Sequence, residues 1–251
     1  MFELENLSVG YKGRPVMEGV SLTFRPGEIT TIIGKNGTGK STLLKTACSL
    51  LKPLAGSVRL EGKAQQDHTR RQWAQKVAFL AQSHADSNCT VHSLVTHGRY
   101  PHLGFSRSMG EGDLRLVEDA LATMGIGELR DTSLLQISGG ERQKAYLAMA
   151  LAQDTPYLCL DEPATYLDLA VHKEILRLLG ALKAQGKCII AVMHDVGAAL
   201  EVSDHICLLG NGGVLSYARP EALVRGGLME EAFGVACTQV STREGERYLF
   251  T

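Results

Sequence analysis

The sequence has no long apolar segment and no excess of charge of either sign. No stretch of its 251 residues approaches the ~18–20 consecutive apolar residues that a helix needs to cross a bilayer. Lys+Arg total 26 and Asp+Glu total 27, a net charge of −1, which excludes a broad basic face, so no nucleic-acid partner is expected. The first residues also lack the basic-then-apolar order of a signal peptide, so no signal peptide is expected.

Paired metal-ligand or disulfide patterns are also missing. The six cysteines include no CxxC pair, and Cys159 and Cys188 lie inside apolar runs, which indicates buried, reduced thiols. Four histidines fall in one segment, but no two are four residues apart, so they do not share one helix face as a metal pair would. We expect surface or interface roles for these four: His84, His92, His97 and His102.

The composition is that of an ordinary globular domain, with 44% apolar and 21% charged residues, and disorder is excluded as the main state. Alternating apolar residues up to about residue 25 predict antiparallel strands. Beyond them, short apolar runs alternate with amphipathic stretches, which predicts an α/β fold with a mainly parallel sheet covered by helices. The expected buried strands are 29–33, 77–80, 157–160, 188–193 and 206–209.

From about residue 85 to 153 the strand pattern stops. Leu114, Val117, Leu121 and Met124 recur at helical spacing, and the following Gly125–Gly127 predicts the end of that helix. We therefore expect one domain over residues 1–251, with a helical lobe at about 85–153 inserted into the sheet. Further on, a Gly-Asn-Gly-Gly segment at 210–213 between two apolar runs predicts a hairpin.

The sharpest motif is the segment Gly34-Lys35-Asn36-Gly37-Thr38-Gly39-Lys40-Ser41, which matches GxxxxGK[ST]. Its glycines let backbone amides curl around phosphate oxygens, and the following helix N-terminus adds positive partial charge. Lys40 is expected to reach the β- and γ-phosphates, the Ser41 hydroxyl to ligate Mg²⁺, and Thr42 to belong to the same set. The alternative is a glycine-rich turn without a ligand. The strand before it and the helix after it favour an ATP- and Mg²⁺-binding loop.

An expected strand, Tyr157–Leu160, ends in two acids, Asp161 and Glu162. In phosphate-loop enzymes an acid at this place holds Mg²⁺, usually through water, so Asp161 is expected to do so. Glu162 is then placed to accept a proton from the attacking water or to orient it. The alternative is an acidic pair that merely ends a strand, which a nearby nucleotide loop disfavours.

Another helix is preceded by Ile137-Ser138-Gly139-Gly140-Glu141. Ser138 and Glu141 have the spacing of a capping box, in which each side chain satisfies a backbone amide of the other. Alternatively, the two glycine amides and the Ser138 hydroxyl form a second phosphate-binding helix N-terminus. One chain would rarely need two such sites for one nucleotide, whereas two chains facing each other would.

In this order the motifs resemble those of the ATP-binding subunits of ABC transporters, over nearly the whole chain. Gly34–Ser41 matches the Walker A loop and Leu158–Glu162 the Walker B strand. Ile137–Glu141 matches the signature usually written LSGGQ, with Ile for Leu and Glu for Gln. The resemblance implies a RecA-like phosphate-loop NTPase core with N-terminal antiparallel strands and an inserted helical lobe, and an ATPase activity.

Four single residues match further family positions, and each also has a structural interpretation. The resemblance implies that Tyr11, ahead of the first strand pair, stacks on adenine, and that Gln82 contacts Mg²⁺ or water. It implies that His194 touches the γ-phosphate and, with Lys40, stabilises developing charge, and that Asp168 reaches across a dimer. The structural alternatives are a strand or turn tyrosine, a polar strand end, a core histidine and a helix N-cap.

Two short strings, Gly98–His102 and Thr165–Asp168, resemble the subgroup that imports iron–siderophores, haem or vitamin B12. The resemblance implies a head-to-tail homodimer in which ATP is held by the loop of one subunit and the signature of the other. It also implies peripheral binding at the cytoplasmic face of the membrane, permease subunits docking near Gln82 and residues 83–103, and, indirectly, a solute-binding protein. A soluble ABC ATPase, a subunit of another ABC transporter and a non-catalytic module stay open as alternatives.

Overall fold

Five parallel strands form the centre of the protein, and the computed structural model describes residues 1–83, 87–104, 108–164, 167–242 and 245–251. The central sheet has six strands in the order β10-β9-β3-β8-β7-β6, of which only β10 is antiparallel. Every residue of β7 and β8 is buried, as continuous apolar runs covered on both faces require. The strands are β3 (Ile29–Gly34), β6 (Val77–Leu80), β7 (Tyr157–Asp161), β8 (Cys188–Val192), β9 (His205–Gly210) and β10 (Gly213–Ala218).

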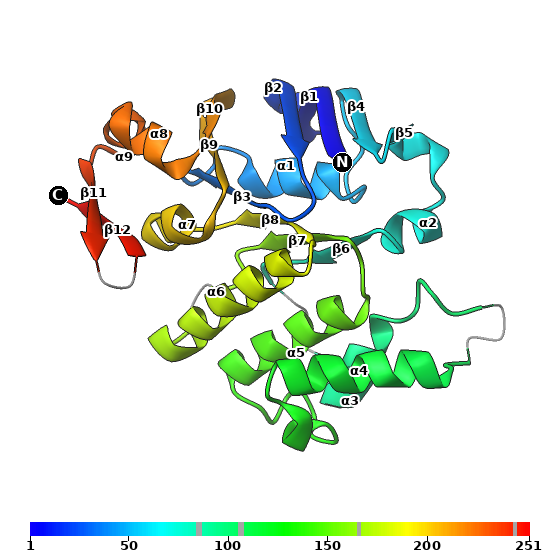
Figure 1. Ribbon diagram of the computed structural model, residues 1–251. Helices are drawn as coiled ribbons and strands as arrows, with labels where there is room; N and C mark the ends of the chain where they lie inside the picture. The colour runs from blue at the N-terminus through cyan, green and yellow to red at the C-terminus, as the bar shows by residue number, and fades with distance from the viewer. Residues whose placement is uncertain (84–86, 105–107, 165–166, 243–244) are drawn as a thin grey trace.

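The strands and the hairpin predicted from the apolar runs are thus confirmed, including the pairing of Gly210 with Gly213 in the β9–β10 hairpin. A second sheet has the order β2-β1-β4-β5, and helix α1 (Lys40–Ala47) lies between the two sheets (Figure 1). The apolar residues that alternate along the first two strands point into this layer and pack with α1 in one buried cluster. The strands are β1 (Phe2–Tyr11), β2 (Arg14–Phe24), β4 (Ala55–Leu60) and β5 (Lys63–Ala64).

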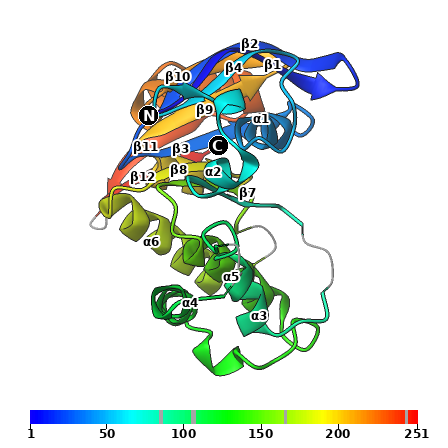
Figure 2. The ribbon, with the colours of Figure 1, turned by 90° about the vertical axis from the view of Figure 1, so that its right-hand side faces the viewer.

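On the opposite side of the central sheet lie the helical segments between β6 and β9 (Figures 1 and 2). The hydrophobic cluster on this side runs from the sheet through α5 into α3 and α4 without interruption. We keep the interpretation of one domain with a lobe at about 85–153. The helices are α3 (Val91–His97), α4 (Glu111–Thr123), α5 (Gly139–Ala152), α6 (Leu169–Ala184) and α7 (Val196–Val202).

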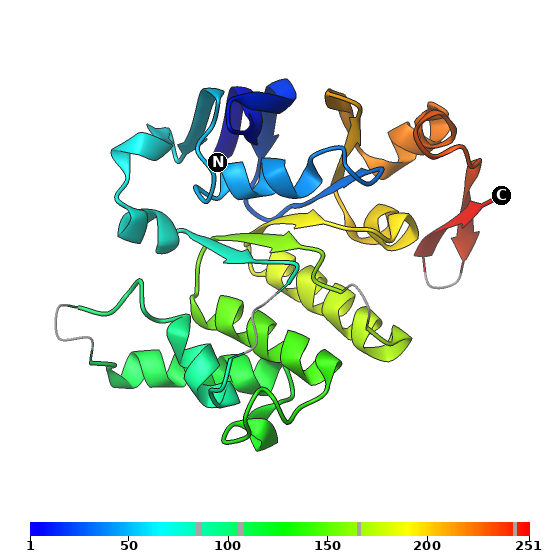
Figure 3. The same ribbon diagram turned by 180° about the vertical axis from the view of Figure 1, so that it is seen from behind.

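The C-terminal region, which carried the least sequence pattern, folds onto α7. Strands β11 (Cys237–Thr242) and β12 (Gly245–Phe250) form a hairpin beside α7, α8 (Pro220–Arg225) and α9 (Leu228–Phe233) (Figure 3). Arg247 of this hairpin pairs with Glu201 of α7 at 3.3 Å. Among the described residues, no helix combines the length and apolar character needed to span a membrane. The remaining elements are α2 (Arg70–Ala74) and 3₁₀ turns at Gln65–Asp67 and Gly127–Leu129.

One helix of the lobe departs from its predicted pattern. Val117, Leu121 and Met124 are buried as expected, and Gly125 with φ 62° follows the end of α4. Leu114 was predicted on the same apolar face, but 45% of it is exposed. It lies in the first turn of α4, near the N-terminal end of the helix.

The crossing of α3 and α5 depends on a glycine, which gives a test of the lobe's packing. A Cβ added to Gly98 would lie 2.2 Å from the carbonyl oxygen of Met149, too close for any side chain. We expect Gly98→Ala to lower the free energy of unfolding by about 2 kcal/mol or more in urea denaturation, because the two helices must separate. The control is Gly180→Ala in α6, where the added Cβ meets no atom within 4 Å; it should be neutral or stabilising by up to ~1 kcal/mol. Equal effects of the two changes would contradict this account of the crossing.

Candidate nucleotide-binding site

The loop between β3 and α1 has the backbone conformation that its glycines predict. Gly37 and Gly39 have φ values of 84° and 94°, in the left-handed region that glycine tolerates without strain. A Cβ on Gly39 would also lie 2.7 Å from Cγ1 of Val16. Thr38 Oγ1 donates a hydrogen bond to the carbonyl of Lys35 at 2.9 Å, which closes the loop on itself.

Lys40 holds its ammonium inside this loop. Its Nζ donates to the carbonyl oxygens of Gly34 at 2.8 Å and Lys35 at 3.1 Å. Burial lowers the pKa of Lys40, while the nearby carboxylates of Glu162 and Asp161 raise it. The loop therefore places a cation next to its curled backbone, where a bound phosphate would lie.

Asp161 ends β7 directly beside the start of α1. Ser41 Oγ donates to Asp161 Oδ1 at 2.8 Å, and the other carboxylate oxygen, Oδ2, is buried with no hydrogen-bond partner in the described part of the chain. Burial raises the pKa of Asp161, whereas the Ser41 hydroxyl and the cations Lys45 and Lys40 lower it. A serine hydroxyl and an unpaired buried carboxylate oxygen are the oxygen ligands that Mg²⁺ prefers.

Glu162 follows in an unusual backbone conformation. Its φ is 54°, a left-handed value that is uncommon outside glycine, and its backbone amide donates to Val192 of β8 at 3.0 Å. Its Oε2 accepts a hydrogen bond from Nε2 of Gln82 at 2.8 Å. Within the chain the Gln82 amide therefore bonds the Glu162 carboxylate, and the expected contact of Gln82 with Mg²⁺ or water stays a prediction.

A cavity of about 540 Å³ lies over the loop. It brings the predicted catalytic residues Lys40, Gln82, Glu162 and His194 together, although they come from four separate parts of the chain. It also includes Val16 of β2, which the sequence analysis did not identify. The pairing of the start of β2 with the end of β1, which carries Tyr11, is the signal that could have found it. The rest of its lining is residues 36, 37, 39, 41 and 42, while Gly34, Thr38 and Asp161 lie below that surface.

Tyr11 needs a correction, because it does not precede the first strand pair. It is the last residue of β1 and pairs with Arg14 across the turn to β2. The turn at Lys12 and Gly13 leaves the tyrosine 50% exposed, and its hydroxyl accepts a hydrogen bond from Thr42 Oγ1 at 3.4 Å. The residue therefore lies at the rim of the loop, next to α1.

The signature segment forms a separate cavity of about 330 Å³, whose lining includes Ser138, Gly139, Gly140, Glu141 and Asp168. None of its lining residues is shared with the cavity over the loop. The predicted capping box is present. Ser138 accepts from the backbone amide of Glu141 at 3.3 Å, and the Glu141 carboxylate accepts from the Ser138 amide at 2.8 Å.

Asp168, which also lines the signature cavity, has a local structural role. Asp168 Oδ1 accepts from the amides of Ala170 and Val171, each at 2.9 Å, so the predicted N-cap of α6 is confirmed. Its expected contact across a dimer remains a prediction. The two residues before Leu167, Thr165 and Tyr166, lie outside the described residues.

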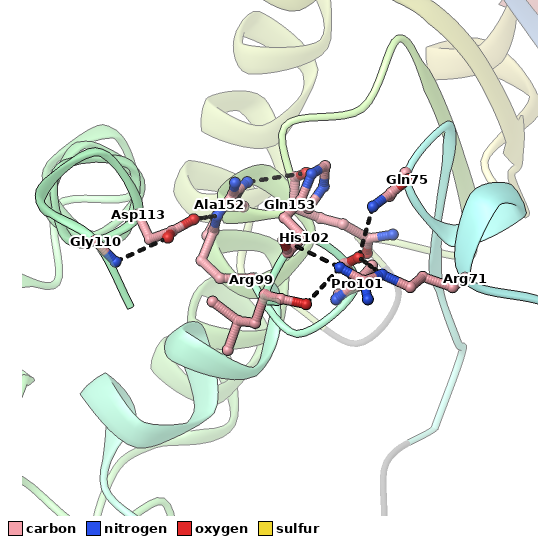
Figure 4. A network of polar contacts seen from close by, with 10 residues as sticks. Arg71, Gln75, Arg99, Pro101, His102, Gly110, Asp113, Ala152 and Gln153 are labelled. Atoms are coloured by element: carbon pink, nitrogen blue, oxygen red, sulfur yellow. Dashed lines mark hydrogen bonds and ion pairs between the residues drawn. The ribbon is translucent and has the colours of Figure 1, made fainter. Parts of the chain in front are cut away.

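The Gly98–His102 string, used above only for resemblance, has a clear role inside this chain (Figure 4). Arg99, 6% exposed, pairs with Asp113 of α4 at 2.9 Å and donates to the carbonyl of Ala152 in α5 at 2.8 Å. The amide of Gly110 and the Arg99 guanidinium lower the pKa of Asp113. From the other side, Arg71 and Gln75 bond the carbonyl of Pro101 at 2.9 and 2.8 Å, so the string joins the lobe helices to the segment around α2.

Among the histidines of the segment 84–102, His97 is exposed, and His92 and His102 are half-buried. His92 lies 3.6 Å from Glu118, and no cluster of three or more metal-ligating side chains occurs in the described ranges. His84 lies outside the described residues.

Comparison with known proteins decides the family. Residues 17–165 match the sequence profile of the ABC transporter ATP-binding domain. The chain belongs to this ABC transporter family. The cassette is 40% identical to the iron(3+)-hydroxamate import ATP-binding protein FhuC of Bacillus subtilis, covering 92% of this chain and 87% of the relative. It is 37% identical to the ferric enterobactin transport ATP-binding protein FepC of Escherichia coli, covering 93% and 87%.

Solved structures agree on the fold. The cassette superposes on the dimeric bacterial ABC transporter cassette MJ0796 with a TM-score of 0.78 and 25% identity, over 88% of this chain and 99% of that one. A chain from an inward-facing transporter of metal-chelate type gives a TM-score of 0.85 at 21% identity, over 100% and 97%. The predicted α/β phosphate-loop fold is confirmed. The cassette is an ATP-binding, ATP-hydrolysing motor subunit of an ABC importer.

Burial destabilises the charge of Asp161 more than Ser41, Lys45 and Lys40 stabilise it, so the pKa is raised in the nucleotide-free chain. We expect Asp161→Asn to raise the thermal midpoint of the nucleotide-free protein by about 2–4 °C at neutral pH, and to abolish Mg-ATP hydrolysis. Burial raises the pKa of Asp161 in the folded state. The gain in stability from Asn is therefore complete above that raised pKa. It disappears as the pH falls toward ~3.9, the pKa of an Asp in the unfolded chain.

Scanning calorimetry at several pH values and a phosphate-release assay measure both effects. The control is Asp131→Asn, at an exposed acid, which should change neither property. A lower midpoint for Asp161→Asn at neutral pH would show that the site solvates the carboxylate well and would contradict the proposed cation site.

Proposed function

We propose that this cassette powers uptake of an iron–siderophore chelate, or of haem or vitamin B12, through separate permease subunits. In this proposal two copies form a head-to-tail dimer, and each ATP is held by the phosphate loop of one copy and the signature of the other. The names of the FhuC and FepC relatives support the cargo class. One observation above all supports the shared site: a single chain carries its two phosphate-binding elements in two cavities with no lining residue in common.

The signature glycines support the same conclusion. A Cβ on Gly139 would meet nothing within 4 Å, and one on Gly140 would make only ordinary contacts, at 3.9 and 4.0 Å. Glycine within a helix costs up to ~1 kcal/mol relative to alanine, and nothing within the described chain requires it here. Close approach of a phosphate from outside the chain would require it, because the backbone amides must reach the oxygens.

Within one such site, this chain's residues divide the work of phosphoryl transfer to water. Lys40 binds the β- and γ-phosphate oxygens, and Ser41 and Asp161 would hold Mg²⁺, which would supply further positive charge at the phosphates. Glu162 accepts a proton from the attacking water or orients it, and His194 stabilises charge on the γ-phosphate. Positioning and electrostatics are sufficient, and no covalent intermediate is required.

The γ-phosphate provides the switch. While it is present it binds both copies, so it favours the closed dimer, and its hydrolysis removes that preference. Gln82 donates to Glu162 and directly precedes the segment 83–103. We place the permease contact near Gln82 and this segment, at the cytoplasmic face of the membrane. Tyr100, 58% exposed, is an apolar residue available to such a contact. Co-purification with the permease and identification of the transported solute would test the cargo.

Glu162→Gln tests the shared site. The amide keeps the size of the side chain but cannot accept a proton, so we expect turnover to fall by ~10²–10⁴-fold while ATP binding is kept. Size-exclusion chromatography with saturating Mg-ATP should then show a dimer that is missing without nucleotide. A variant that binds ATP by calorimetry but elutes only as a monomer would contradict the shared site.

The matched variant adds Gly140→Ala to Glu162→Gln. The added methyl group has room in the free chain, so the thermal midpoint should be unchanged or slightly higher. It would lie near Leu167 and Val171 in the signature cavity, where the proposal places the phosphate of the partner copy, so the double variant should bind ATP and stay monomeric.

A further inference from the structure

The signature carries an acid, Glu141, where the family pattern has glutamine. Glu141 accepts the hydrogen bond of the Ser138 hydroxyl, which in the proposed shared site would bind the nucleotide. Glu141 Oε2 accepts a hydrogen bond from Ser138 Oγ at 2.7 Å and from the Ser138 amide at 2.8 Å. No acceptor among the described residues pairs with the amides of Gly139 or Gly140. The signature thus offers two free donors, while its third donor is bound to a carboxylate of the same chain.

The charge of Glu141 is not required by the local fold. A capping box is formed equally by glutamate or glutamine at this position, because only a side-chain oxygen is needed to accept from the cap amide. Hydrogen bonds from the Ser138 hydroxyl and amide, with a smaller effect of Lys144, lower the pKa of Glu141. The side chain is therefore ionised at neutral pH, and its charge needs another explanation.

Among the described residues that line the signature cavity, acids outnumber cations. Lys144 is the single cation among the described residues that line the signature cavity, and its Nζ pairs with Glu174 at 2.7 Å. The second acid of the cavity, Asp168, already accepts two amides of α6. A triphosphate that enters this cavity meets a lining with more negative than positive charge.

We propose that Glu141 is a positioning residue that weakens the ATP-bound dimer, by holding the Ser138 hydroxyl in the free cassette and by repelling the phosphates of the nucleotide bound to the partner copy. The inference rests on the proposed shared site. For the signature to bind a phosphate, the Ser138 hydroxyl must turn its hydrogen bond from the Glu141 carboxylate to a phosphate oxygen. The carboxylate then stays beside a polyanion, within the range where like charges repel strongly. After hydrolysis this repulsion favours opening.

The test uses Glu141→Gln in the Glu162→Gln background, with Mg-ATP as the ligand. Glutamine keeps the capping box and removes the charge from both sites of the dimer. We expect the protein concentration at half-dimerisation, measured by sedimentation velocity, to fall at least fivefold. The difference between the two proteins should shrink as NaCl rises, because salt screens the repulsion; loss of a structural cap would not produce this dependence.

Controls and outcomes separate this inference from the proposed function. Glu230→Gln on α9, which removes the same charge from an exposed position, should leave the protein concentration at half-dimerisation unchanged. A second variant, Glu141→Ala, removes the capping acceptor together with the charge; it should lower the thermal midpoint but still strengthen the ATP-bound dimer. A Glu162→Gln protein that never dimerises overturns the shared site itself. A protein that dimerises equally well, or less well, when Glu141 is neutral overturns the role assigned to Glu141.

Discussion

The hydrogen bond between Ser41 and Asp161 joins the two halves of the catalytic machinery within one chain. It is possible because β3 and β7 are parallel strands of one sheet, so the loop after β3 and the acids after β7 emerge at the same edge. Helix α1 then presents its N-terminus to that edge, and both of its sides are covered by the two sheets. A phosphate bound there would meet Lys40 and the backbone amides, with an acid pair beside them. The remaining residues of the cavity are arranged around this one junction.

The same architecture separates the signature from the phosphate loop, which is the reason for proposing a shared site. The signature begins α5 on the lobe, and α5 reaches the central sheet at its edge strand, β6, so its N-terminal cavity is separate from the loop cavity. The segment Gly98–His102 is held on both sides. Arg99 bonds the carbonyl of Ala152 in α5, and Arg71 and Gln75 bond the carbonyl of Pro101. A lobe held in this way presents the signature outward as a surface for another molecule. The fold therefore separates the phosphate loop of one copy from the signature of the same copy.

Much of this organisation could be predicted from the sequence, because it depends on local patterns. Continuous apolar runs indicated the buried strands, and the glycine spacing indicated the phosphate loop. The caps at Ser138–Glu141 and Asp168 could be predicted because their side chains bond backbone amides two or three residues away. The missed features join distant residues. Gln82 meets Glu162 across 80 positions, Arg99 reaches Asp113 and Ala152, and Tyr11 is placed by the register of β1 and β2. No periodicity encodes such contacts, and the C-terminal hairpin has too weak an alternation to be recognised.

The central claim is that ATP is held fully only between two copies of this chain. The most direct measurement is the ATPase rate per chain as a function of protein concentration, with sedimentation velocity in the same buffer to report the fraction of dimer. The account predicts that the rate per chain falls in parallel with the dimer fraction on dilution and approaches zero where the protein is monomeric. A rate per chain that stays constant where only monomer sediments would contradict it.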